Sequence, residues 1–177
     1  IDLSEPLALC RQLYDQGVRL INMTMGSPYY NPHVNRPYNT GGYEPPEHPL
    51  QGIERSLYLA GELKKAVPDM TVVGTGFSYL SFLSPYLAAG VVEQGLADVV
   101  GFGRQAFAYP DFARDVLNAA MQIQKGYTMD PSDVLDRSKC CLACGKCTEL
   151  MRAGKITGCA VRDTEIYLPL YREIKKI

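Results

Sequence analysis

The fold is decided by a short apolar stretch that ends in two glycines and an arginine, ADVVGFGR at residues 97–104. Its first five residues are typical of a buried strand, and similar strands are expected at residues 18–23 and 70–73. Helical patterns separate the later strands, at roughly residues 51–67 and 79–94. Short apolar strands that alternate with helices indicate parallel βα units.

Three such strands cannot close a barrel, and a parallel sheet with one uncovered face would be unusual. We therefore expect an α/β fold that is the C-terminal portion of a TIM (β/α)8 barrel, about three βα units, with the rest of the barrel upstream of Ile1. Residues 1–125 would form this half barrel, 126–165 a cysteine-rich cluster-binding segment, and 166–177 a tail or linker. Because the chain begins without Met and shows no signal peptide, we expect an excised piece of a cytoplasmic protein.

The composition excludes several classes of partner. Among the 177 residues, 46% are hydrophobic and 21% are charged, as in a globular protein. The formal net charge is −1 and there is no basic stripe, which argues against a nucleic-acid partner. No apolar run approaches the roughly 20 residues of a membrane span, so we expect no membrane partner.

Cysteine usage indicates a metal centre. Of the six cysteines, Cys10 lies in a helical pattern and the other five lie between positions 140 and 159. Disulfides of a secreted domain would be spread across the loops they close, so this clustering favours metal. Three cysteines have C-x2-C-x2-C spacing and a fourth follows after eleven residues; these are Cys141, Cys144, Cys147 and Cys159.

Three thiolates from one turn and one from a later segment suit a cubane iron–sulfur cluster. A tetrahedral zinc site also accepts four thiolates, although zinc ribbons usually present two separated C-x2-C pairs. Cys140 could replace Cys141 as a ligand, and we favour Cys141.

Two glycine-bearing strand ends suggest a phosphate site. The sequences are GTGFS at residues 74–78 and GFGR at residues 101–104. In barrels, the loops after the last strands commonly hold a phosphate, because glycine lets backbone N–H groups approach the anion. Arg104 could add a charged, forked contact. The alternative is that these glycines only turn the chain from strand to helix.

Together these motifs resemble the Old Yellow Enzyme family of NADH:flavin oxidoreductases, in particular its iron–sulfur branch of 2,4-dienoyl-CoA reductase and trimethylamine dehydrogenase type. The matching stretches are 97–104, followed by Pro110-Asp111, and 141–159; the resemblance covers about residues 3–161. The cysteine spacing departs from the dienoyl reductase pattern, with two rather than three residues between the second and third ligands.

The resemblance implies a barrel that holds FMN at its mouth, with the phosphate against the backbone of Gly76, Phe77 and Gly103 and the side chain of Arg104. It implies a 4Fe–4S cluster on the four cysteines named above. NAD(P)H would be the electron donor, although the chain has no G-x-G-x-x-G fingerprint of its own.

The resemblance also implies a reaction and its partners. The substrate would be a small molecule with an activated C=C bond, an alkene or enoyl thioester, and a second flavin domain and oligomerisation are compatible with it. The long loop at residues 26–49 holds His33, where the reductases place a histidine that helps to protonate the substrate; the alternative is a solvated loop histidine. Without the upstream strands, this segment alone should be inactive.

Two rival classes of function remain open. One is a non-flavin TIM-barrel enzyme with a phosphate site and a structural zinc ion, and the other is a non-catalytic electron-relay module.

Overall fold

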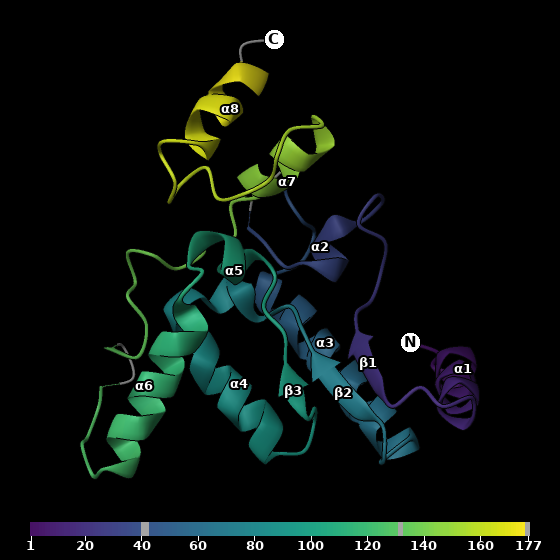
Figure 1. Cartoon of the computed structure of the whole chain (residues 1–177). Helices are drawn as coiled ribbons and strands as arrows, with labels where there is room; N and C mark the ends of the chain where they lie inside the picture. The colour runs from purple at the N-terminus through teal and green to yellow at the C-terminus, as the bar shows by residue number, and fades with distance from the viewer. Residues whose placement is uncertain (40–42, 131–132, 176–177) are drawn as a thin grey trace. The chain divides into compact units, whose positions relative to one another are not determined.

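The computed structural model of the chain describes residues 1–39, 43–130 and 133–175. Its helices and strands follow one another as Figure 1 shows: α1 (Ser4–Asp15), β1 (Leu20–Met23), α2 (Pro32–Asn35), α3 (Pro49–Ala66), β2 (Thr71–Gly74), a 3-10 segment η1 (Phe77–Leu83), α4 (Ser84–Glu93), β3 (Val99–Val100), α5 (Arg104–Ala108), α6 (Phe112–Gln124), α7 (Lys146–Arg152) and α8 (Tyr167–Ile174).

The chain divides into two compact units, each made of three separate segments. The first unit comprises Ile1–Pro37, Glu47–Phe77 and Leu87–Gly101. The second unit comprises Tyr38–Pro46, Ser78–Tyr86 and Phe102–Ile177. The domain boundary expected near residue 125 falls inside the second unit, whose last segment begins at Phe102, two residues after the end of β3.

The first unit contains a three-stranded parallel sheet in the order β1-β2-β3 (Figure 1). Leu20 pairs in register with Thr71, and Val73 pairs with Val99. Asp98 joins the ladder, because its carboxylate accepts a hydrogen bond from the Val72 N–H at 2.8 Å and forms an ion pair with Lys64 at 2.9 Å. The strands are parallel, as the alternation of strands and helices predicted; closure into part of a barrel stays a prediction.

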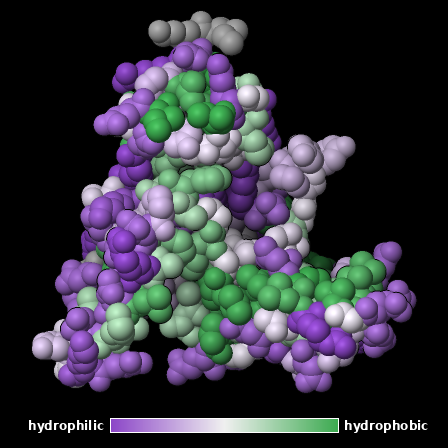
Figure 2. Space-filling view, in the orientation of Figure 1, coloured by the Kyte–Doolittle hydropathy of each residue, from purple (hydrophilic) through white to green (hydrophobic). Residues whose placement is uncertain are grey.

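The two faces of this sheet differ. Helix α3 packs against β1 and β2, and Val72 and Gly74 are buried. Leu20 is 59% exposed and Val99 47% exposed, and they lie on the face that Thr71 and Val73 share. Figure 2 shows apolar side chains gathered over the strands. In the part of the chain that the structure describes, one face of a parallel sheet is therefore largely uncovered, which is unusual for this class of sheet.

One predicted helix begins later than expected. Instead of one helix over residues 79–94, the chain forms η1 and then α4, which starts at Ser84. Ser81 between them has φ 54° and ψ −123°, a conformation that L-residues rarely adopt. The Ser84 hydroxyl donates to the Ser81 carbonyl oxygen at 2.7 Å, and this local bond stabilises the kink.

The second unit has its own apolar core around α6. Tyr109, Leu135 and Cys140 are buried together, and partly buried side chains pack against them, namely Phe82, Phe112, Val116 and Val134. Helices α7 and α8 contact each other, with Glu149 accepting a hydrogen bond from the Tyr171 hydroxyl at 3.1 Å. None of the helices in the described residues has the length and apolar character that crossing a membrane requires.

Candidate metal centre

The four predicted cysteine ligands line one small cavity in the second unit. Cys141 and Cys144 come from the loop before α7, Cys147 from its first turn, and Cys159 from the loop before α8. The cavity has a volume of about 20 Å³. The rest of its lining consists of small, apolar and basic residues: Arg104, Phe107, Leu142, Gly145, Lys146, Ala160, Val161 and Arg162. Residues eighteen positions apart in sequence are thus brought to one place.

The backbone of the cysteine loop turns sharply to present these thiols. Ala143 has φ 51° and Gly145 has φ 76°, and α7 begins directly afterwards at Lys146. The Ala143 N–H donates to the Cys141 sulfur at 3.3 Å. A left-handed alanine costs on the order of 1–2 kcal/mol, and such strained residues cluster at functional sites.

The Gln105 side chain fixes the start of the cysteine loop through hydrogen bonds. Its side chain is fully buried, and its Oε1 accepts a hydrogen bond from the Cys141 N–H at 2.9 Å. Its Nε2 lies 3.5 Å from the Cys140 sulfur, and its own N–H donates to the Ser78 hydroxyl at 3.3 Å. The residue after Arg104 therefore fixes the backbone of Cys141, the first predicted ligand.

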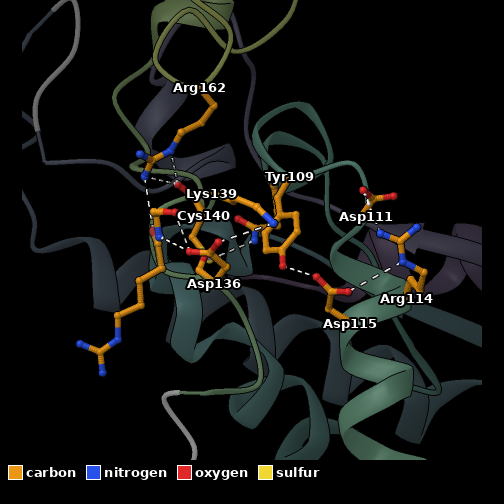
Figure 3. A network of polar contacts seen from close by, with 11 residues as sticks. Tyr109, Asp111, Arg114, Asp115, Asp136, Lys139, Cys140 and Arg162 are labelled. Carbon is orange, nitrogen blue, oxygen red and sulfur yellow. Dashed lines mark hydrogen bonds and ion pairs between the residues drawn. The ribbon is translucent and has the colours of Figure 1, made fainter.

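Cys140 and Cys141 point to different surroundings. Cys140 is buried in the apolar core of the second unit, and its thiol donates to the Asp136 carbonyl oxygen at 3.3 Å. Arg162 holds the Cys140 carbonyl oxygen with two donors, Nη2 at 2.8 Å and Nε at 3.1 Å (Figure 3). Cys141, in contrast, lines the cavity. Of the two, Cys141 is the one that faces the other three predicted ligands, and its assignment as a ligand stays a prediction.

The polar network around Cys140 continues to the far side of Tyr109 (Figure 3). The Tyr109 hydroxyl donates to Asp115, which also faces Arg114. Burial, followed by the hydrogen bond to Asp115, raises the pKa of Tyr109 to about 12. The Tyr109 side chain is therefore uncharged, and its hydrogen bond to Asp115 holds it in the apolar core that also contains Cys140.

Arg104 contributes positive charge to the cavity. Its Nη1 atom is inaccessible to solvent, and the guanidinium interacts electrostatically with the thiols of Cys141, Cys144 and Cys147. Burial lowers the pKa of Arg104, and these thiols act in the opposite direction. Burial also raises the pKa of the Cys141 and Cys147 thiols, whereas Arg104 lowers it. The cation therefore favours the thiolate forms, which are the forms that bind metal.

The fourth predicted ligand, Cys159, is positioned by a glycine and an aromatic ring. A Cβ atom at Gly158 would overlap the ring of Tyr167, so the ring lies directly on the backbone next to Cys159. Only glycine permits this approach. Tyr167 is the first residue of α8, and its contact ties that helix to the Cys159 loop.

The four thiols are chemically suited to bind an iron–sulfur cluster. The cavity between them would have to widen to admit one. Four thiols with three basic neighbours suit an anionic iron–sulfur centre. In the described residues, no group of three or more His, Cys, Asp or Glu side chains is placed to hold a single metal ion. A volume of about 20 Å³ is close to that of one water molecule. Loading would require the thiols to rotate outward, and a single side-chain torsion per cysteine allows this.

The residues predicted to hold a phosphate are divided between the two units. Gly76, with φ 104°, and the buried Phe77 belong to the first unit. Gly103 is exposed and has open space where a Cβ would lie, and it precedes Arg104 in the second unit. Gly101 is restricted for a packing reason, because a Cβ there would approach Thr75 Cγ2 to 2.8 Å. The phosphate contact of Arg104 stays a prediction, and the structure places its guanidinium in the cysteine cavity.

His33 lies in the short helix α2 and is 7% exposed, which differs from a solvated loop residue. Its Nε2 is 3.9 Å from Glu47 Oε1, and Arg55 binds the other oxygen of Glu47. A carboxylate beside an imidazole can orient the ring.

Several residues of this centre carry no mark in the sequence. Gln105 and Arg162 act through backbone groups of the cysteine loop, and the Tyr167 contact depends on Gly158, nine residues earlier in the sequence. The only feature of the sequence that could have pointed to these residues is that they lie close, along the chain, to the glycine–arginine motif or to the cysteines. Comparisons of this chain with protein-family models, with curated proteins and with solved structures gave no match.

Proposed function

We propose that this chain is a segment of an FMN- and 4Fe–4S-dependent oxidoreductase that reduces an activated C=C bond with electrons from NAD(P)H. The observation that carries the proposal is the cavity lined by Cys141, Cys144, Cys147 and Cys159. The sequence motifs supply the rest, because the cysteine spacing and the stretch at residues 97–104 resemble the iron–sulfur branch of the Old Yellow Enzyme family.

The four cysteines would hold the cluster, each through its thiolate. In enzymes of this kind, the flavin supplies hydride transfer and the cluster supplies single-electron relay. The part of this chain is to fix the ligands: Gln105 orients the Cys141 backbone, and Arg162 fixes the adjacent peptide through the Cys140 carbonyl oxygen. The positive charge of Arg104 opposes the effect of burial on the Cys141 and Cys147 thiols and favours their thiolate forms.

The flavin part of the proposal rests on the glycine-bearing strand ends. Gly76 and Phe77 follow β2, and Gly103 and Arg104 follow β3. The carboxyl ends of barrel strands are where such folds bind phosphate groups, and glycines there leave backbone N–H groups accessible. The uncovered face of the sheet also supports an arrangement in which further strands complete the fold.

His33 is our candidate for the acid that donates a proton to the substrate. Glu47 would orient the imidazole, because its Oε1 lies 3.9 Å from His33 Nε2 and Arg55 holds its other oxygen in place. Proton donors are commonly histidines that a neighbouring carboxylate orients.

The test is anaerobic purification of the intact protein, with an absorption spectrum and quantitation of iron, acid-labile sulfide, zinc and flavin. We expect about four irons and four sulfides per chain, which is the stoichiometry of a cubane cluster, together with flavin bands. A colourless preparation, or zinc without sulfide, would overturn the proposal.

Cysteine variants make the test specific. Cys141→Ser, Cys144→Ser, Cys147→Ser and Cys159→Ser should each lose most of the iron and sulfide. The matched control is Cys140→Ser, because Cys140 is adjacent in sequence but lies in the apolar core, and a serine hydroxyl can still donate to the Asp136 carbonyl. It should retain the cluster. Cluster loss in Cys140→Ser with retention in Cys141→Ser would reverse the ligand assignment.

A further inference from the structure

We propose that Arg104 is the electrostatic counterpart of the four thiolates and raises the reduction potential of the centre they hold. This inference rests on the proposed function, because it concerns the cluster assigned to Cys141, Cys144, Cys147 and Cys159. It assigns to Arg104 a positioning and tuning role that the glycine–arginine motif does not predict.

The charge of Arg104 is close to the ligands and shielded from water. The side chain lines the cysteine cavity, and its Nη1 atom is inaccessible to solvent. It interacts electrostatically with three of the four ligand thiols, those of Cys141, Cys144 and Cys147. Charge interactions are several times stronger where water is excluded than at the surface, so this cation acts with little screening.

The two other basic residues of the cavity direct their charges elsewhere. The Lys146 ammonium lies over the Tyr171 ring, 5.3 Å from its centroid. The Arg162 guanidinium donates to the Cys140 carbonyl oxygen. In the described residues that line the cavity there is no carboxylate to oppose these cations. Arg104 is therefore the basic residue whose charge acts on the thiols themselves.

The direction of the effect follows from charge balance. A cluster on four thiolates is anionic, and reduction by one electron adds one negative charge to it. A fixed cation a short distance away in a low-dielectric environment stabilises the reduced state more than the oxidised state. Net charge and hydrogen bonds to sulfur are among the factors that set the potentials of such clusters. Removal of the Arg104 charge should therefore make reduction harder.

The experiment compares Arg104→Lys, Arg104→Gln and Arg104→Met in the intact protein, after anaerobic cluster loading. The readouts are iron and sulfide per chain and the reduction potential from an EPR-monitored titration. At the wild-type midpoint, we expect Arg104→Gln to lower the ratio of reduced to oxidised cluster at least tenfold, which is a shift of about 59 mV for a one-electron couple. Arg104→Lys should change that ratio less than threefold.

The matched control is Lys146→Gln, which removes one charge from the same cavity lining but from the ammonium that lies over Tyr171. It should also change the ratio less than threefold. If both neutral Arg104 variants stay folded by circular dichroism but lose the cluster, while Arg104→Lys keeps it, the requirement for charge is supported.

Equal potentials in wild type, Arg104→Gln and Arg104→Met would overturn the inference. So would a loss in Arg104→Lys as large as that in the neutral variants, because the effect would then come from shape rather than charge. A wild-type protein without iron and sulfide would overturn the proposed function itself, which distinguishes the two failures.

Discussion

At the scale of single residues, Gln105 shows how a side chain outside the predicted ligand set can fix the backbone of the cysteine loop. It is 0% exposed, and its amide bridges the Cys141 N–H and the Cys140 sulfur. Gln105→Leu has a similar volume but leaves the Cys141 N–H buried without an acceptor, which costs about 1–3 kcal/mol. We expect the free energy of unfolding to fall by about 2 kcal/mol on that basis, measured by urea unfolding followed by circular dichroism.

The control for this prediction is Gln124→Leu, since Gln124 is exposed at the last position of α6. Its effect should stay within about 0.5 kcal/mol, as for most surface substitutions. Equal stability losses in the two variants would show that the buried amide of Gln105 has no special role.

Gly158 gives a second prediction at this scale. A methyl group at this position would overlap the Tyr167 ring, so Gly158→Ala must displace either the ring or the Cys159 loop. Overpacking of this kind costs about 1–3 kcal/mol. We expect lower stability in urea unfolding and, after anaerobic loading, less iron per chain.

A glycine-to-alanine substitution at a position with free space should have the opposite effect on stability. Gly90 lies inside α4, and nothing is within 4 Å of a Cβ built there. Gly90→Ala should therefore raise the free energy of unfolding by about 0.5–1 kcal/mol, through the lower backbone entropy of alanine. If Gly158→Ala were as stable as Gly90→Ala, the Tyr167 contact would not be part of the folded state.

At the scale of helices and strands, the break between η1 and α4 can be tested directly. Ser81 there has φ 54° and ψ −123°, where glycine is favoured over serine. Ser81→Gly should raise the free energy of unfolding by about 1 kcal/mol, because the strain of a non-glycine residue in such a region is on the order of 1–3 kcal/mol and glycine loses more backbone entropy.

Ser84→Gly is the opposing control. Ser84 is buried, and its hydroxyl donates to the Ser81 carbonyl oxygen, so its loss should destabilise by about 1 kcal/mol. Thermal unfolding of both variants and of wild type shows whether Ser81→Gly raises stability and Ser84→Gly lowers it. Destabilisation by Ser81→Gly would mean that the serine side chain itself stabilises the kink.

Much of the element order could be predicted from periodicity. The helix expected over residues 51–67 is α3, since it carries apolar residues at helical spacing. The break at Ser81 could not be predicted, because the apolar pattern continues through it. The start of α3 was also hidden: His48 caps it, with its Nδ1 accepting from the Leu50 N–H and its own N–H donating to Gln51.

In the candidate site, the cysteines could be predicted from the sequence, but the residues that hold them in place could not. Spacing alone identified the cysteines that line the cavity, because a C-x2-C-x2-C turn brings its thiols to one side. The contacts that fix them come from Gln105, Arg162 and Tyr167, and they depend on tertiary packing across up to 36 positions of sequence. No local pattern encodes such contacts.

At the scale of the whole molecule, the uncovered face of the sheet predicts association. Leu20 and Val99 are exposed on it, and large contiguous apolar surfaces tend to associate, so we expect this face to contact another apolar surface. The double variant Leu20→Lys/Val99→Lys should bind several-fold less of a hydrophobic dye and self-associate less, as measured by fluorescence and by sedimentation velocity.

Its control adds the same two charges away from the sheet. Ile156 and Ile166 are similarly exposed but lie in the loops around Cys159. Ile156→Lys/Ile166→Lys should leave dye binding closer to wild type. An equal decrease in both double variants would show that net charge, and not the sheet face, controls association.

Each of the two units is built from three separate segments of the chain, and this limits how a protease can separate them. The chain enters each unit three times, so no single peptide-bond cleavage can release one from the other. Limited proteolysis should then give nicked fragments that remain together rather than a free unit that carries the cysteine loop.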